Sequence, residues 1–280
     1  MKIQFTKMHG AGNDFVMIDD RNEEIPWADH FLMAALAARR TGIGCEGIIL
    51  LQKSDKADFR MRFLNPDGAE ADMCGNGARC AAAFAREIGA CGKALTMETR
   101  CGLVDAEIKD RGLVCVWLPE PTQRRYGIEI SADGETVCGD FINTGVPHFV
   151  VPVENLSQVD VQRLGRKIRL HQEFAPEGTN VDFVSLRTPN RLSMRTYERG
   201  VEAESGACGT GAAACAVVAV EQHNFSLPAK IKTTTGYDLE IDGDWRRRKC
   251  TGLTLTGPVC LVYRGEIDLA NADLGGAIID

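Results

Sequence analysis

The sequence lacks the features that mark several large classes of protein. No apolar run approaches the roughly 20 residues that a membrane-spanning helix needs, and the N-terminal MKIQFTKMHGAG contains no long apolar segment typical of a secretory signal. Lys and Arg number 32 against 39 Asp and Glu, so the net charge of −7 predicts no broad basic surface for nucleic acid. We therefore expect a cytoplasmic protein that binds neither membranes nor nucleic acid.

Metal-binding patterns are also missing. The chain has 11 cysteines, yet no two are spaced as Cys-x-x-Cys, and there is no His-Glu-x-x-His. An odd number of cysteines in a cytoplasmic protein indicates free thiols rather than a disulfide framework. We therefore expect no metal site. The composition is typical of a globular protein, since 44% of the 280 residues are hydrophobic and 25% are charged.

One stretch of the sequence occurs twice. Residues 71–83, ADMCGNGARCAAA, return in altered form at residues 206–216, GACGTGAAACA. Each copy has a cysteine, a Gly-polar-Gly step and a run of small residues. Three pairs share a spacing of 134 positions: Cys74 and Cys208, Gly102 and Gly236, and Phe15 and Phe149. The spacing predicts two halves with one plan, each of ordinary domain size.

Prolines at 119 and 121 mark the expected boundary between the halves. We predict a first half at residues 1–121, to which a C-terminal tail at 266–280 returns, and a second half at 122–265. Helices are predicted at 27–40, from Cys74 to about 88, at 159–168, and from Cys208 to about 223. Strands are predicted at 2–5, 15–18, 47–51, 57–64, 94–98, 102–109, 113–118, 126–130, 141–143, 149–153, 181–186, 191–197, 230–234, 237–241, 252–256 and 259–263.

The helices that follow the two cysteines are apolar on nearly every side, which predicts that they are buried all round. Because they are rich in alanine they are thin, so strands can approach them closely. We therefore predict an α/β (α+β) fold in which each half is a mostly antiparallel sheet curled around a central helix. An open α/β sheet is the alternative, although short consecutive strands favour antiparallel pairing.

Each repeated cysteine precedes a helix, where unpaired N–H groups and the positive end of the helix dipole stabilise anions. We expect this position to lower the thiol pKa from about 8.5 toward neutrality or below. Two such helix starts related by a pseudo-twofold axis could hold one carboxylate, with a sulfur on each side. This arrangement suits removal of a proton from the carbon beside the carboxylate and its return to the opposite face.

The same residues allow two other functions to be compared with this one. Residues 209–214, GTGAAA, fit a dinucleotide-binding G-x-G-x-x-A pattern, but the preceding segment is turn-like and the twin copy breaks the pattern at Cys80. A hydrolase with a nucleophilic cysteine would need a paired histidine such as His9 or His148, and it would leave the second cysteine unexplained.

Several motifs resemble those of the diaminopimelate epimerases, which are cofactor-independent enzymes of lysine and cell-wall precursor synthesis: MHGAGNDF, NPDGAEADMCGNGARC, GVPHFV, GTNVDFV, YERGVEAESGACGTGAAA and TGP. The resemblance covers essentially the whole chain. It implies two pseudo-symmetric halves with the active site in the cleft between them, no cofactor, and a homodimer. It also implies that one α-carbon of LL-2,6-diaminopimelate is inverted, giving the meso form, by transfer of protons between a thiolate and a thiol.

The resemblance assigns roles to individual residues. It implies that Cys74 and Cys208 are the two catalytic bases and that His148 and Glu198 tune their protonation. The positions that match substrate-binding residues are Asn13, Asn65, Gly75, Asn76, Asn180, Glu198, Arg199, Gly209 and Thr210. An arginine such as Arg199 suits two-pronged binding of a second carboxylate.

Two alternatives remain beside this function. A related two-cysteine racemase could act on proline, hydroxyproline or histidine, although proline racemases typically carry MCGHG where this chain has MCGNG. The other is a non-catalytic protein that binds amino acids. The chain departs from the epimerases at Val146, where asparagine is frequent, and at Ser205-Gly206.

Overall fold

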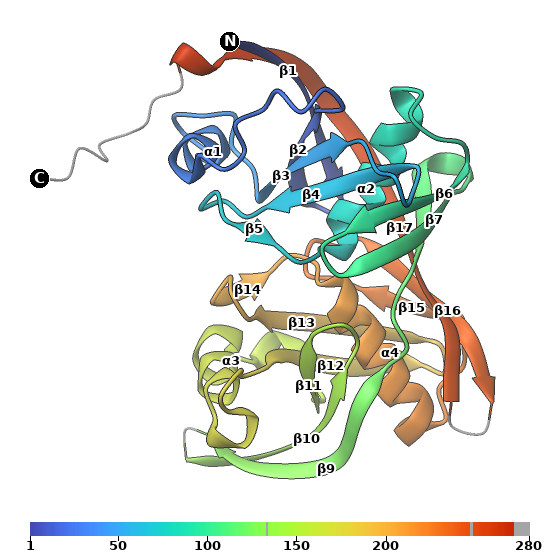
Figure 1. Cartoon of the computed structure of the whole chain (residues 1–280). Coiled ribbons are helices and arrows are strands. Elements are labelled where there is room, and N and C mark those ends of the chain that lie inside the picture. The colour runs from blue at the N-terminus through green and yellow to red at the C-terminus, as the bar shows by residue number, and fades with distance from the viewer. Residues whose placement is uncertain (133, 247–248, 272–280) are drawn as a thin grey trace, which may run out of the picture. The chain divides into compact units, whose positions relative to one another are not determined.

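The computed structural model describes residues 1–132, 134–246 and 249–271, which fold as a mixture of helices and strands (Figure 1). The helices are α1 His30–Ala37, α2 Gly75–Glu87, α3 Val161–Arg169 and α4 Gly209–His223. The strands are β1 Lys2–Gly10, β2 Asn13–Asp19, β3 Gly47–Gln52, β4 Phe59–Leu64, β5 Glu70–Ala71, β6 Ala94–Thr99, β7 Gly102–Ile108, β8 Leu113–Trp117, β9 Thr122–Ala132, β10 Glu135–Asn143, β11 Pro147–Pro152, β12 Asn180–Thr188, β13 Arg191–Glu198, β14 Ala203–Ser205, β15 Ala229–Lys232, β16 Asp238–Arg246 and β17 Lys249–Asp268. None of the described helices is long and apolar enough to cross a membrane.

The chain forms two compact units. Unit 1 comprises Met1–Val116 and the C-terminal segment from Gly257, and unit 2 is Trp117–Thr256. The chain passes from unit 1 to unit 2 after residue 116 and returns after residue 256. Both changes come before the boundaries expected from the sequence, which are at residues 121 and 265. The second change comes earlier because β17 continues without a break and its later part pairs with β1, in a register that places Lys2 opposite Asp268. Residues 272–280 of the expected tail lie outside the described residues.

Unit 1 begins with a tight hairpin. Ala11 and Gly12, with φ angles of 53° and 90°, form the left-handed turn that joins β1 to β2. After α1 the chain returns as β3, parallel to β2, and β4 and then β5 add antiparallel pairings. After α2 the chain returns as β6, parallel to β4, and continues antiparallel through β7 and β8.

Unit 2 has the same order of pairings. β10 and β11 form the antiparallel hairpin, and after α3 the chain returns as β12, parallel to β11. β13 and β14 add antiparallel pairings; after α4, β15 runs parallel to β13 and is followed by β16 and β17. Most strand pairs in each unit are therefore antiparallel, with two parallel pairings where a helix intervenes.

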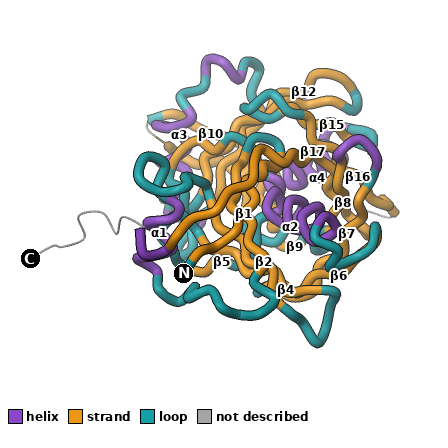
Figure 2. Tube along the Cα trace, turned by 90° about the horizontal axis from the view of Figure 1, so that it is seen from above, coloured by secondary structure: helices purple, strands orange, loops and turns teal. Residues whose placement is uncertain are grey.

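In each unit the helix that follows the repeated cysteine is enclosed by strands. α2 contacts β1, β2, β3, β4 and β7, and α4 contacts β10, β11, β12, β13, β15 and β16. Figure 2 shows both helices among the orange strands. Nearly every residue of the two helices is buried as far as Ala85 and Ala219, and the small side chains allow this close packing. A second apolar cluster in each unit lies under α1 or α3.

Several predicted elements differ in extent from those observed. The helix predicted at 27–40 is limited to α1, which begins after Asp29, whose side chain accepts a hydrogen bond from the Leu32 N–H at 3.0 Å. The strands predicted at 252–256 and 259–263 are one strand, β17. The Gly257-Pro258 step does not break it, and the Pro258 carbonyl still accepts a hydrogen bond from the Ala11 N–H at 3.2 Å.

Candidate active site

Each repeated cysteine is the residue that caps the start of a buried helix. Cys74 precedes α2 and Cys208 precedes α4, and both have extended backbone angles. Their carbonyl groups accept the first helical hydrogen bonds, from Ala78 and Ala212 at 2.8 and 3.0 Å. Cys208 is buried, whereas Cys74 is half-buried. Both cysteines therefore lie beside N–H groups that the helix itself does not use.

Glycines allow close packing around each helix start. A side chain at position 10 would bring its Cβ within 2.8 Å of the Asn76 carbonyl oxygen, so the MHGAG hairpin can lie against the start of α2 only with glycine there. At position 211 a Cβ would lie 2.5 Å from Oδ1 of Asp182. Glycine at 211 thus leaves room for a buried carboxylate beside the start of α4.

A chain of hydrogen bonds leads from the Cys208 sulfur into the core of unit 2. Thr210 Oγ1 lies 3.5 Å from Cys208 Sγ and 3.0 Å from His148 Nε2, and His148 Nδ1 lies 2.7 Å from Asp182 Oδ2. His148 and Asp182 are completely buried. Because a carboxylate only accepts, Nδ1 donates to Asp182, and in a neutral imidazole Nε2 then accepts from the Thr210 hydroxyl. The Thr210 oxygen can in turn accept the Cys208 proton.

Two members of this network, Asp182 and Thr196, were not predicted from the sequence. Asp182 accepts hydrogen bonds from His148 and from the Thr196 hydroxyl, the latter at 2.6 Å, so both of its oxygens are bonded. Thr196 comes from β13 and Asp182 from β12, strands that pair directly with Asp182 opposite Thr196. The available signal was a carboxylate in the middle of the apolar run NVDFV, where burial requires partners.

The expectation that a helix start lowers the pKa of both cysteines is wrong for Cys208. Burial, together with the nearby charges of Glu198 and Asp182, raises the pKa of Cys208 well above its ordinary value. The contact with Thr210 and a hydrogen bond from the Gly211 N–H, whose nitrogen lies 3.4 Å from the sulfur, lower the pKa of Cys208 but are outweighed. Cys208 is therefore a thiol at neutral pH.

Glu198 is partly buried at the end of β13. Its pKa is raised by burial, while the Ser205 hydroxyl and His148 act in the opposite direction and Asp182 raises it further. Its charge also acts on Cys208. The structure thus brings Glu198, His148, Cys208 and Thr210 into one electrostatic network. That Glu198 and His148 tune the thiol stays a prediction.

Asn180 and Arg199 also lie together. The Asn180 amide donates to the Pro147 carbonyl at 3.0 Å, and its Oδ1 accepts from the Arg199 backbone N–H at 2.7 Å. Arg199 is partly buried, and its Nη1 donates to the Glu177 carbonyl at 3.3 Å. Asn180 therefore positions the backbone of Arg199, because both ends of its amide group are bonded to the protein.

In unit 1, Gly75 and Asn76 form the first turn after Cys74, and both are buried. Asn13 begins β2, and its Oδ1 is buried without a hydrogen-bond partner among the described residues. A buried acceptor without a partner is costly, so this atom suits a ligand donor. Asn65 follows β4 and forms a turn in which its carbonyl accepts from the Gly68 N–H at 2.9 Å.

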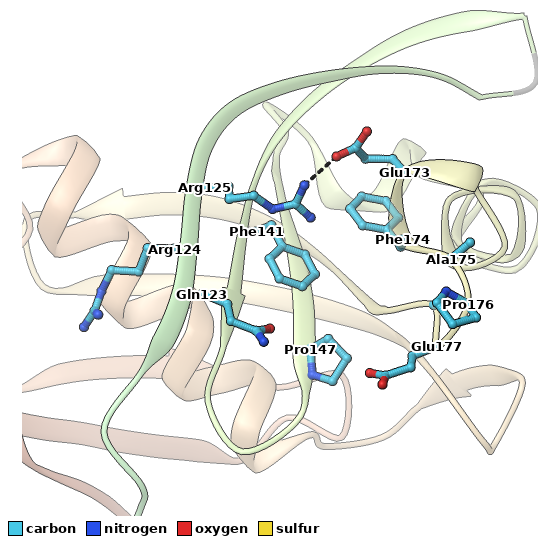
Figure 3. A pocket seen from close by; sticks show the side chains of 11 residues that line it. Gln123, Arg124, Arg125, Phe141, Pro147, Glu173, Phe174, Ala175, Pro176 and Glu177 are labelled. Carbon is cyan, nitrogen blue, oxygen red and sulfur yellow. Dashed lines mark hydrogen bonds and ion pairs between the residues drawn. The ribbon is translucent and has the colours of Figure 1, made fainter.

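A hollow of about 460 Å³ in unit 2 is separate from these groups (Figure 3). Phe141 and Phe174 are stacked at its wall, and Arg125 forms an ion pair with Glu173 beside them. No predicted site residue lines this hollow, although Glu177, whose carbonyl contacts Arg199, does. Among the described residues, no group of three or more acidic, histidine or cysteine side chains is arranged to hold a metal ion.

Glu198→Gln is expected to lower the pKa of Cys208, because it removes a negative charge that raises that pKa. One pKa unit corresponds to a roughly tenfold change in the thiolate fraction. Alkylation of Cys208 by iodoacetamide at neutral pH should therefore become several-fold to about tenfold faster, as measured by mass spectrometry of its peptide. Glu129→Gln, at an exposed position of β9, is the control. Slower or unchanged alkylation would show that Glu198 does not control this thiol.

Solved structures with the same fold have diverged far in sequence. A probable proline racemase from Agrobacterium radiobacter K84, solved with bound carbonate, superposes with a TM-score of 0.74 at 17% identity, over 95% of this chain and 93% of that one. A phenazine biosynthesis protein of the PhzF family from Bacillus anthracis gives the same TM-score at 16% identity, over 95% and 99%. At these identities the likeness concerns the fold alone.

Sequence relatives are much nearer. A protein of Aquifex aeolicus (strain VF5) named diaminopimelate epimerase is 42% identical over 95% of this chain and 98% of its own length. One of the same name from Chlorobaculum tepidum is 40% identical over 94% and 100%. The family description diaminopimelate epimerase matches residues 5–120 and 141–261, which include both repeated cysteines and the network around Cys208. On this evidence the chain belongs to the diaminopimelate epimerase family.

Proposed function

We propose that this protein inverts one α-carbon of LL-2,6-diaminopimelate to give the meso form, by proton transfer to and from Cys74 and Cys208. The observation that carries the proposal is the repeated helix start: in a chain of this family, each unit has one cysteine that caps a buried helix with a Gly-polar-Gly first turn. The same order of strand pairings in both units supports an origin by duplication, with each unit supplying one of the reacting groups.

The reaction needs one thiolate and one thiol. The thiolate takes the α-proton, so that the C–H bond breaks, an S–H bond forms, and the electron pair passes to the adjacent carboxylate. The thiol then donates its proton to the opposite face, so that its S–H bond breaks and a new C–H bond forms. N–H groups at Gly75, Asn76, Gly209 and Thr210 stabilise the charge that develops on the carboxylate.

Cys208 suits the thiol role in the resting enzyme. Its raised pKa keeps the proton on sulfur, and the chain through Thr210 and His148 to Asp182 orients that proton. Cys74 then acts as the base that removes the first proton. After one turnover the two roles are exchanged, and proton exchange with solvent must restore the initial protonation state.

Residues away from the thiols are proposed to hold the rest of the substrate. Asn13 Oδ1 suits an ammonium group, and the Arg199 guanidinium suits the second carboxylate. Asn65, Asn180 and Glu198 complete the proposed binding residues. We further propose that the enzyme works as a cytoplasmic homodimer without a cofactor.

Arg199→Lys is expected to raise KM for diaminopimelate roughly tenfold or more, with a smaller change in kcat, because a single ammonium replaces a planar two-pronged donor. Steady-state kinetics would measure both constants. Arg187→Lys, at an exposed position of β12, provides the matched control. An unchanged KM would mean that Arg199 does not bind the second carboxylate.

The proposed function is tested by incubating purified protein with LL-diaminopimelate in heavy water, without added pyridoxal phosphate or metal, followed by chiral analysis. We expect meso product that carries deuterium at the inverted carbon. Parallel incubations use proline, hydroxyproline and histidine. Activity on one of these but not on diaminopimelate would overturn the assignment, as would activity that a chelator abolishes. Binding without exchange would indicate a non-catalytic protein.

A further inference from the structure

The largest completely buried side chain in the described part of the protein is that of an arginine, Arg79 in α2. Arginine is almost never fully buried unless it is paired, because an isolated charge away from water is unfavourable by several kcal/mol. The groups that act on the charge of Arg79 in the described structure are the sulfurs of Cys80 and Cys74 rather than a carboxylate. This buried cation therefore needs another explanation.

Arg79 is bonded to the two residues that follow Cys74. Its Nη1 donates to the Gly75 carbonyl at 3.2 Å and its Nη2 donates to Asn76 Oδ1 at 2.7 Å, while Nε is buried without a partner among the described residues. Because Oδ1 of Asn76 faces the guanidinium, the NH₂ group of its amide points away from Arg79. Arg79 thus fixes the first turn of α2 and the orientation of a residue proposed to hold the reacting carboxylate.

Of the two thiols on which Arg79 acts, only that of Cys74 can be stabilised as an anion by its charge. Cys80 is completely buried, and burial raises its pKa far above the ordinary range despite the cation, so it stays neutral. The other groups that act on Cys80 are Cys74 and the thiol of Cys260 on β17. Cys74, by contrast, is only half-buried. A neighbouring positive charge lowers the pKa of such a thiol.

The second helix lacks this cation. At the spacing of 134 residues that relates Cys74 to Cys208, Arg79 corresponds to Ala213. The charged groups that act on Cys208 are instead the carboxylates of Glu198 and Asp182. The two repeated helix starts therefore differ in charge, although their backbone and sequence patterns agree.

We propose that Arg79 is a positioning residue that favours the thiolate of Cys74 and orients Asn76 toward the reacting carboxylate, so that Cys74 is the base and Cys208 the acid in the resting enzyme. This inference rests on the proposed function for its catalytic meaning, but its electrostatic part concerns the free protein. The unsatisfied positive charge is offset by the Cys74 thiolate and, in the complex, by the substrate carboxylate.

The test compares Arg79→Gln, which removes the charge but retains a hydrogen-bond donor, with Arg79→Lys, which retains the charge. The pH dependence of Cys74 alkylation by iodoacetamide is measured by mass spectrometry in the absence of substrate. In Arg79→Gln we expect alkylation of Cys74 at neutral pH to slow roughly tenfold, which corresponds to a rise of about one pKa unit. Arg79→Lys should keep the alkylation profile close to that of the wild type while KM rises, because one ammonium cannot bond Gly75 and Asn76 as the guanidinium does.

Arg86→Gln, at an exposed position of the same helix, is the matched control, and circular dichroism identifies variants that remain folded. A folded Arg79→Gln protein whose Cys74 alkylates with the wild-type pH profile would overturn the proposal. If Arg79→Gln does not fold, a slowed Cys74 in folded Arg79→Lys would overturn it, and a wild-type profile together with a raised KM would support it. Since alkylation requires no turnover, a failure to epimerise diaminopimelate would contradict the proposed function and leave the electrostatic inference intact.

Discussion

Replacement of either Cys74 or Cys208 by alanine is expected to abolish epimerisation, because each face of the α-carbon needs its own acid or base. Loss of a positioned general acid or base lowers rates by about 10²–10⁴-fold. The remaining thiol can still remove a proton from one epimer and return it to the same face. Cys208→Ala should therefore exchange the α-proton of one epimer for deuterium without inversion, and Cys74→Ala should exchange the other. Chiral analysis with mass spectrometry separates exchange from inversion.

The matched controls are Cys80→Ala and Cys215→Ala, which remove buried thiols from the same two helices. Each should retain most of its activity, with at most a modest loss of stability from the small cavity. Near-normal inversion in Cys74→Ala or Cys208→Ala would contradict the two-base mechanism. Complete loss of exchange in both, in folded proteins, would mean that the two thiols act only together.

Asp182→Asn is expected to lower kcat about 100-fold or more with little change in KM. The amide would donate to His148 Nδ1, which shifts the imidazole proton to Nε2 and reverses the hydrogen bond to Thr210. Removal of the negative charge would also lower the pKa of Cys208, so a larger fraction of this residue would be thiolate, which has no proton to donate. The same variant should thus be slower in turnover and faster in alkylation at Cys208, an opposite pair of effects that general misfolding would not produce.

Asp140→Asn is the control for this change. Asp140 is also a buried aspartate of unit 2, and it bonds the Gly127 N–H at 2.8 Å rather than the histidine. It should leave the alkylation of Cys208 unchanged. If Asp182→Asn kept wild-type turnover and a wild-type Cys208 profile, the hydrogen-bonded chain would have no part in the reaction.

Features that depend on local pattern could be predicted from the sequence. The helices that begin after Cys74 and Cys208 were expected from a cysteine, a Gly-polar-Gly step and a run of small residues, and the structure confirms both starts. Their burial followed from the apolar residues on every side. The short strands β5 and β14 were not predicted, because neither is long enough to show an alternating pattern.

Features that depend on which residues meet in space could not be predicted in the same way. The sequence does not show that Asp182 lies beside His148, because the contact depends on the parallel pairing of β11 with β12. The raised pKa of Cys208 follows from burial and from two carboxylates on other strands, which outweigh the local effect of the helix start. Arg79 is one residue of the MCGNGARC motif, and the sequence pattern does not show that its side chain is completely buried.

The long strand β17 has a consequence for how the chain acquires its structure during synthesis. Unit 2 is continuous in sequence, whereas unit 1 is completed by residues that follow unit 2. β1 emerges from the ribosome long before its partner in the register Lys2–Asp268. We therefore expect the middle of the chain to reach its native state before the N-terminal part does. Until then, β1 exposes an unpaired edge, which makes this nascent segment prone to association with other chains.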